Sequence, residues 1–333
     1  MYIVPLSVAQ DVAARSSDDR RVAFPLAWIL LAMAGSAALT LGLLVDGRIV
    51  VHLFTPAATP VLIWLALTFG ATWLLRDAAG ARGQAVADCA LHYGLITTMS
   101  LMGAVATYPV AGLSRGFVDG TLERIDVALR FDWLAWYEAV AAHPMLQVVG
   151  HIAYQSIYLS PAILFAWFAW QGRRADARAF LSAYWLAAFV TIALFGAMPA
   201  EGPFALLWHR PIPYMPDSGL WQPELIPALR HHAVHAIDLG ELRGLVSAPS
   251  FHTAAAVLYI VTAWPIRRLR WPLLGLNVAM LASTPVEGTH YLVDMLLGAL
   301  VAAVALTAVA ALRSFREGRI MREAAIRRPR LVR

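Results

Sequence analysis

Eight apolar stretches follow one another along the chain. They cover residues 24–45, 59–75, 91–112, 146–170, 179–199, 251–266, 271–286 and 290–312. Each is long enough, or nearly so, to cross a hydrocarbon core of about 30 Å as a helix. The sixth and seventh are the shortest, which suits helices whose ends are sheltered around a water-accessible pocket. The pattern therefore predicts an all-α fold: a polytopic membrane helical bundle of about eight transmembrane helices.

The composition agrees with this fold and excludes several others. Hydrophobic residues make up 60% of the 333 residues and charged residues only 14%, whereas a soluble domain carries about 25% charged residues. This excludes an ordinary soluble enzyme and a disordered chain. The single cysteine, Cys89, cannot form an internal disulfide, so the chain needs no oxidising compartment.

The basic residues indicate topology rather than nucleic-acid binding. All 26 are arginine, because the sequence contains no lysine, and they are not gathered on one soluble face. Nineteen fall in the N-terminal segment, in alternate loops and in the C-terminal tail. The excess of positive charge on the cytoplasmic side predicts an integral membrane protein with both termini inside, in a bacterial inner or cell membrane. The connections at residues 113–145 and 200–250 then face the periplasm or exterior.

These two outer connections have different patterns. In the first, Leu122, Ile125, Leu129 and Trp133 recur at helical spacing with acidic residues on the opposite face, which predicts a surface-lying amphipathic helix over residues 117–140 with a structural role. The second, residues 200–250, is rich in proline and histidine and predicts an irregular loop rather than a pair of helices. A connection of this length is often a lid or a binding element.

Two short segments carry the candidate chemistry. One is Pro249-Ser250-Phe251-His252, at the outer start of the sixth stretch, and the other ends in His290 and Asp294, at the turn into the eighth. The chain between them passes in and returns, so His252 and His290 reach the same outer surface. His290 and Asp294 lie four residues apart and would share one helix face, where the carboxylate orients the imidazole. Attack of His290 on phosphorus would give a phosphohistidine, and His252 could protonate the leaving oxygen.

Other residues are candidates for binding the substrate. Ser250 is a suitable N-cap, and the amides that follow it, from Phe251 onward, could bind phosphate. Three outer-loop arginines could supply countercharge, or could instead pair with loop carboxylates: Arg210, Arg230 and Arg243. Three tyrosines could line a pocket, although aromatic residues in a span usually serve packing: Tyr154, Tyr158 and Tyr291.

Two alternatives remain open. His231 and His235 lie four residues apart and precede Asp238 and Glu241, a spacing that could hold zinc on a helix, although loop solvation is the simpler interpretation. No metal or other cofactor is otherwise indicated. A non-catalytic membrane transporter or lipid-binding scaffold is the competing class. Transporters often place ionisable groups near the bilayer midplane, whereas these residues lie at helix ends.

At these residues the chain resembles the type 2 phosphatidic acid phosphatase (PAP2) superfamily, whose second motif is Pro-Ser-Gly-His and whose third is Ser-Arg followed by His and, four residues on, Asp. Phe251 and Thr284 replace the usual glycine and arginine, and the ending His290-Tyr-x-x-Asp294 is more similar to the inositolphosphotransferase branch that contains inositol phosphorylceramide synthase. The first motif, a lysine seven residues before Arg-Pro, is not intact: Arg210-Pro211 is present, but position 203 is proline. Another outer-loop arginine, or backbone amides, must then hold the phosphate.

The resemblance implies a fold, roles and a function. It covers residues 90–312 and implies a six-helix core, with His290 as nucleophile, Asp294 as its orienting carboxylate and His252 as acid. We expect three parts: residues 1–85 with two extra membrane helices, a catalytic core at 86–312, and a basic tail at 313–333. The expected activity is that of a PAP2-type phosphoric ester hydrolase or phosphotransferase. Its substrate would be a phospholipid or prenyl phosphate in the bilayer, with an inositol phosphate or another head group as the transferred group; no protein partner is indicated.

Overall fold

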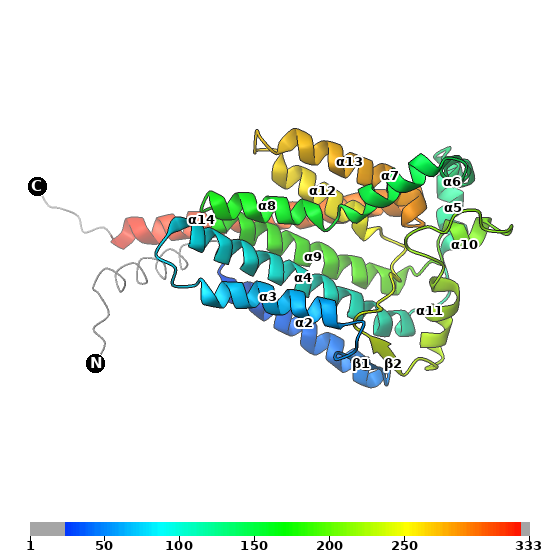
Figure 1. The fold of residues 1–333 in the computed structure, drawn as a ribbon, viewed down its shortest axis with the longest axis horizontal. Helices are drawn as coiled ribbons and strands as arrows, with labels where there is room; N and C mark the ends of the chain where they lie inside the picture. Colours follow the sequence, from blue (N-terminus) through cyan, green and yellow to red (C-terminus); the bar gives the residue numbers. More distant parts are fainter. Residues whose placement is uncertain (1–23, 328–333) are drawn as a thin grey trace, which may run out of the picture.

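The computed structural model of the chain describes residues 24–327, which form thirteen helices and two short strands (Figure 1). The helices that coincide with the predicted apolar stretches are α2 (Leu26–Asp46), α3 (Thr59–Leu74), α4 (Ala81–Leu113), α7 (Pro144–Gln155), α8 (Leu159–Trp170), α9 (Arg174–Ala197), α12 (Phe251–Ala263), α13 (Arg270–Glu287) and α14 (Leu292–Arg327). The remaining elements are α5 (Asp119–Ala128), α6 (Trp133–Ala141), α10 (Pro203–Leu207), α11 (Gln222–Arg230), β1 (Val50–His52) and β2 (Ala236–Asp238).

Every predicted apolar stretch is helical, but the count of eight membrane spans is not established. Four of the described helices, α2, α4, α9 and α14, are long and apolar enough to cross a membrane. A fifth span results if α7 and α8, which meet at a bend of 42°, are taken together. Helix α12 has 13 residues and is therefore only about 20 Å long, short of a full crossing. These helices are compatible with an integral membrane protein.

The main core lies where α4, α8, α9, α12 and α14 pack together. Its fully buried members include Leu164, Leu181, Ala256 and Tyr259. The elements of the two outer connections, α5, α6, α10 and α11, gather with the β pair at one end of the bundle, and the C-terminal part of α14 lies at the opposite end (Figure 1). Helix α13 packs against α6 and α7, and α14 packs against α5. The outer elements thus contact the turn between α13 and α14.

The first outer connection differs from its prediction. Two helices, α5 and α6, replace the single amphipathic helix, and the chain turns between them at Arg130, which has a φ of +60°. Of the four apolar residues at helical spacing, Leu122 and Trp133 are buried, whereas Ile125 and Leu129 are exposed. The acidic residues Asp119 and Asp126, expected on the solvent face, are buried. The reason is that their carboxylates accept main-chain hydrogen bonds, which helical periodicity does not reveal.

The second outer connection is more regular than predicted. It contains α10, α11 and β2, and β2 pairs in parallel with β1, with Val50 opposite Ala236. Both boundaries of the predicted division of the chain fall inside continuous helices, residue 85 in α4 and residue 312 in α14. The N-terminal segment up to residue 23 and the last six residues of the basic tail lie outside the described residues.

Candidate active site

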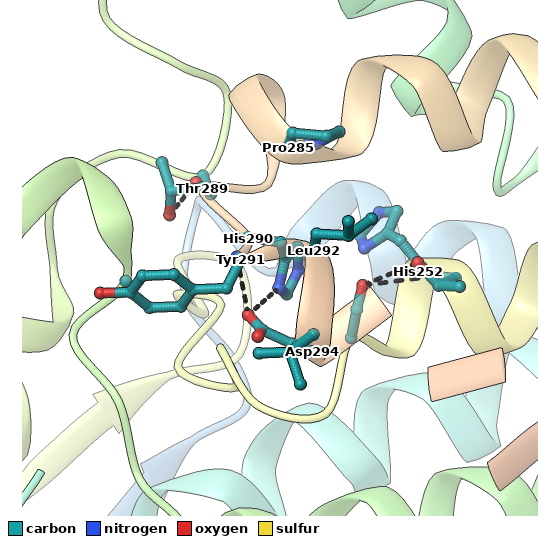
Figure 2. Close-up of polar contacts among 12 residues, drawn as sticks. His252, Pro285, Thr289, His290, Tyr291, Leu292 and Asp294 are labelled. Carbon is teal, nitrogen blue, oxygen red and sulfur yellow. Dashed lines mark hydrogen bonds and ion pairs between the residues drawn. The ribbon is translucent and has the colours of Figure 1, made fainter. Parts of the chain in front are cut away.

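His290 and Asp294 form a buried pair at the start of α14. The His290 Nδ1 atom lies 3.2 Å from Asp294 Oδ2, and both side chains are at most 3% exposed. The predicted contact is present, but His290 precedes the helix, in the turn 288–291 between α13 and α14 (Figure 2). Asp294 Oδ2 also accepts the Tyr291 amide at 3.0 Å, as a third-position acid does when it caps a helix. Because Nδ1 faces the carboxylate, Nε2 is the ring nitrogen left for chemistry.

The turn that carries His290 requires particular backbone geometry. Thr289 has a φ of +48°, a region that β-branched residues seldom occupy. Gly288 lies under the imidazole, where an added Cβ would come within 2.6 Å of His290 Cδ2. Gly202, with a φ of +96°, packs so closely that an added Cβ would lie 2.9 Å from the Thr289 carbonyl oxygen. Close backbone packing therefore holds His290 in place.

His252 lies in the first turn of α12. Ser250 is the N-cap of this helix, and its hydroxyl accepts the Thr253 amide, which confirms the predicted cap. Tyr154, from α7, stacks on the His252 ring with centroids 3.9 Å apart, and its hydroxyl lies 3.1 Å from His252 Nδ1. The arrangement leaves Nε2 of His252 as the nitrogen that can exchange a proton with a ligand.

One cavity of about 620 Å³ joins the two histidines, a volume within the range of about 300–1,000 Å³ that is usual for ligand sites. His252, His290, Phe251, Tyr154 and Tyr158 all line it. Ser250 and Tyr291 are not among its lining residues. The Ser250 hydroxyl accepts the Thr253 amide as the N-cap of α12, and Tyr291 is fully buried on the other side of the turn. Figure 2 shows the Tyr291 ring directed away from His252. The structure therefore does not place Tyr291 in the pocket.

The three candidate arginines have different surroundings. Arg243 lines the cavity and stacks over Trp221 at 4.1 Å, and no carboxylate within residues 24–327 forms an ion pair with it. Arg210 pairs with Glu138, and Arg230 donates to Ser114 and to the Gly116 carbonyl oxygen. Neither Arg210 nor Arg230 lines the cavity. Of the three, only Arg243 lines the cavity that the two histidines share.

Two buried aspartates, which sequence reasoning placed on a solvent face, hold the turn and the start of α14 from outside. Asp126 accepts the amides of Leu292 and Val293 at 2.7 and 2.9 Å. Burial raises the pKa of Asp126 above its ordinary value, although these two hydrogen bonds lower it. Asp119 accepts the Tyr291 hydroxyl at 3.1 Å and the amides of Glu201 and Gly202. The first outer connection thus positions the turn that carries His290.

Glu287, also missed by the sequence reasoning, connects the end of α13 to the second outer connection. Its carboxylate accepts the Tyr214 hydroxyl at 2.8 Å and the Asp217 amide at 3.2 Å, and its carbonyl oxygen accepts the Ser218 amide. Burial and the hydrogen bond to Glu287 raise the pKa of Tyr214. In the sequence, the only signal for this role was that Glu287 directly precedes the Gly-Thr-His segment. Its position alone did not show that Tyr214 would be its hydrogen-bond partner.

The possible zinc site is not formed. His231 caps the end of α11, and His232 has a φ of +52°, so residues 231–235 are not helical and the assumed spacing does not apply. In the described part of the chain, no group of three or more histidine, cysteine or acidic side chains could hold a metal ion.

The fold and site together define a polytopic helical protein whose buried His–Asp pair and second histidine share a cavity. A family model described as PAP2 superfamily matches residues 120–308, more than half of the chain. The chain therefore belongs to the PAP2 superfamily, and membership implies phosphoric ester hydrolase or phosphotransferase activity. No curated protein and no solved structure matches the chain significantly.

Proposed function

We propose that the protein is an integral membrane lipid phosphatase or phosphotransferase that works through a phosphohistidine on His290 at the outer face of the membrane. The observation that carries the proposal is that His290, paired with Asp294, lines one cavity together with His252. Family membership supports the reaction class. The arginine distribution along the sequence supports the outer location.

In the proposed first step, His290 Nε2 attacks phosphorus and the bond to the leaving oxygen breaks. Asp294 holds Nδ1 and stabilises the positive charge that develops on the ring. His252, oriented by Tyr154, gives a proton to the leaving oxygen. Arg243 lies on the same cavity, and its planar guanidinium suits the phosphate oxygens. It would take the place of the lysine and arginine of the usual motifs, which this chain lacks.

In the second step, an acceptor hydroxyl attacks phosphorus and the P–N bond breaks. His252, now neutral, takes the proton of the acceptor, which restores the starting state. Water as acceptor makes the protein a phosphatase, and the hydroxyl of a lipid or polyol makes it a transferase. An inositol phosphate as the transferred group, suggested by the His-Tyr-x-x-Asp ending, remains part of the proposal.

The test uses purified protein with a panel of phosphatidic acid, prenyl diphosphates and phospholipid head-group donors. Free phosphate and new lipid products are followed in parallel, so that the two acceptor classes are distinguished. Wild type should turn over at least one donor and, quenched with labelled substrate, should carry an acid-labile phosphate that His290→Ala lacks. Normal turnover by His290→Ala would contradict the mechanism. Binding or flux without bond cleavage would instead support a transporter or scaffold.

A further inference from the structure

The cavity extends beyond the part of the chain that matches the family. The lining residues after position 120 include Arg243, His252 and His290. One wall of the cavity comes from α3 and α4, which end before the matched region begins. Helix α3 contributes Val61 and Trp64, and α4 contributes a longer run that includes Met99 and Ala104.

This wall offers a hydrocarbon surface. Its polar side chains are already hydrogen-bonded within the protein: Thr97 donates to the Tyr93 carbonyl oxygen, Ser100 to the Ile96 carbonyl oxygen, and Thr107 to the Ala104 carbonyl oxygen. The Tyr93 hydroxyl donates to the Tyr158 carbonyl oxygen at 2.9 Å. A ligand on this side therefore gains little from polar groups and gains chiefly by burying apolar surface, at about 25 cal/mol per Å².

The same wall reaches the surface of the bundle. Trp64 and Tyr158 both line the cavity, yet they are 44% and 64% exposed. Tyr93 lies between them, edge-on to the Trp64 ring at 5.7 Å and bonded to the Tyr158 main chain. Tyr158 belongs to the bend between α7 and α8, so exposed side chains of α3 and of this bend border the cavity, among helices compatible with a membrane.

Resting on the proposed function, we propose that α3 and α4 form the site for the hydrocarbon tail of the substrate, and that Trp64 and Ala104 on this wall set which chain lengths the enzyme accepts. The occupant is one amphiphile. Its phosphate lies at Arg243 and the histidines, and its chain lies along α3 and α4. Substrate selection then depends on helices outside the family-matched region, while the chemistry depends on residues within it.

The first test compares two probes, dihexanoyl and dioleoyl phosphatidic acid, in detergent micelles. Ala104→Phe places a larger side chain in the cavity along α4, and Trp64→Ala removes an apolar side chain that lines the cavity on α3. In both variants the ratio of kcat/KM for the long-chain probe to kcat/KM for the short-chain probe should fall at least tenfold. Trp73→Ala is the matched control, because Trp73 lies on the same helix, is 62% exposed and does not line the cavity. Its ratio should equal that of wild type. An unchanged ratio in both wall variants would overturn the inference.

The second test does not depend on turnover. A phosphatidic acid with a diazirine near the end of its acyl chain is photolysed with His290→Ala protein, and the adducts are located by mass spectrometry. Adducts should fall on cavity-lining residues such as Met99 and Leu101 and should be lost when Ala104→Phe is added. Adducts confined to outward residues such as Leu67 would refute the tail site. If the wild-type protein turns over no donor of the panel while the adducts still fall on cavity-lining residues, the tail site is supported and only the proposed function is contradicted.

Discussion

The main-chain amide of Ser250 donates a hydrogen bond to the carbonyl oxygen of Asp294 at 3.0 Å. This bond joins the first turn of α12 to the first turn of α14. The two helices are in contact where Gly298 of α14 meets Ser250, and a Cβ added to this glycine would lie 2.2 Å from the Ser250 carbonyl oxygen. The helix starts that carry His252 and the His290–Asp294 pair are consequently joined directly, although the two motifs are far apart in the sequence.

The contact between α12 and α14 predicts that Gly298→Ala inactivates the enzyme. A backbone atom cannot yield as a flexible side chain can, so α12 must shift away from α14, and a displacement of about 1 Å can cost on the order of 10²-fold in rate. The measurement is kcat together with the thermal midpoint in detergent. Gly275→Ala on α13, where an added Cβ meets nothing within 4 Å, is the control and should be stable and active. Full activity of Gly298→Ala would show that the contact is not required.

Asp294→Asn should lower kcat on the order of 10³- to 10⁴-fold, by analogy with the loss of the orienting carboxylate in a catalytic triad. The asparagine keeps an acceptor for the Tyr291 amide but no longer stabilises a positively charged His290. Asp176→Asn, which removes a carboxylate paired with Arg173 and Arg313, is the control for loss of a charge elsewhere and should keep kcat. A loss below tenfold in Asp294→Asn would count against the orienting role.

Asp126→Ala should reduce both stability and kcat. It leaves the buried amides of Leu292 and Val293 without an acceptor, which costs about 1–3 kcal/mol, and it frees the start of α14 beside His290. Asp132→Ala is the matched control, because Asp132 is an exposed N-cap that accepts the Ala135 amide of α6. The control should lose about 1 kcal/mol of stability with kcat retained. Equal kcat in the two variants would argue against a positioning role for Asp126.

Arg243→Gln should lower kcat/KM by about ten- to a hundredfold, since a hydrogen bond to a charged group contributes about 1.5–3 kcal/mol. Arg210→Gln removes an exposed arginine that pairs with Glu138 and should remain near wild type. Steady-state kinetics on the donor identified by the panel decide between them. If Arg210→Gln were the impaired variant, the phosphate site would have to lie outside the cavity.

Treatment with EDTA should leave turnover unchanged. In the proposed mechanism the nucleophile, its orienting carboxylate and the acid are all side chains of the protein, so no metal-bound water is needed. The assay is repeated after chelation and removal of the chelator by gel filtration. Activity that disappears and returns on addition of zinc would contradict this mechanism.

The helices and the central pair of the site follow from local sequence properties. Apolar runs long enough for a helix are helical wherever they occur, because hydrophobic length is a local property. The spacing of His290 and Asp294 was enough to predict their contact, and the return of the chain was enough to predict that His252 lies nearby. The contact forms even though α14 begins only at Leu292, since a turn can bring the same pair together.

Long-range packing decided the rest. Periodicity placed Asp119 and Asp126 in solvent, but the first outer connection folds against α14 and buries them on main-chain amides. Sequence position made Arg210, Arg230 and Arg243 equivalent candidates, and only the path of the second outer connection brings Arg243 to the cavity. The apolar wall from α3 and α4 had no motif at all. Where a side chain points depends on partners distant in the chain, whereas local patterns report only on neighbours within a few residues.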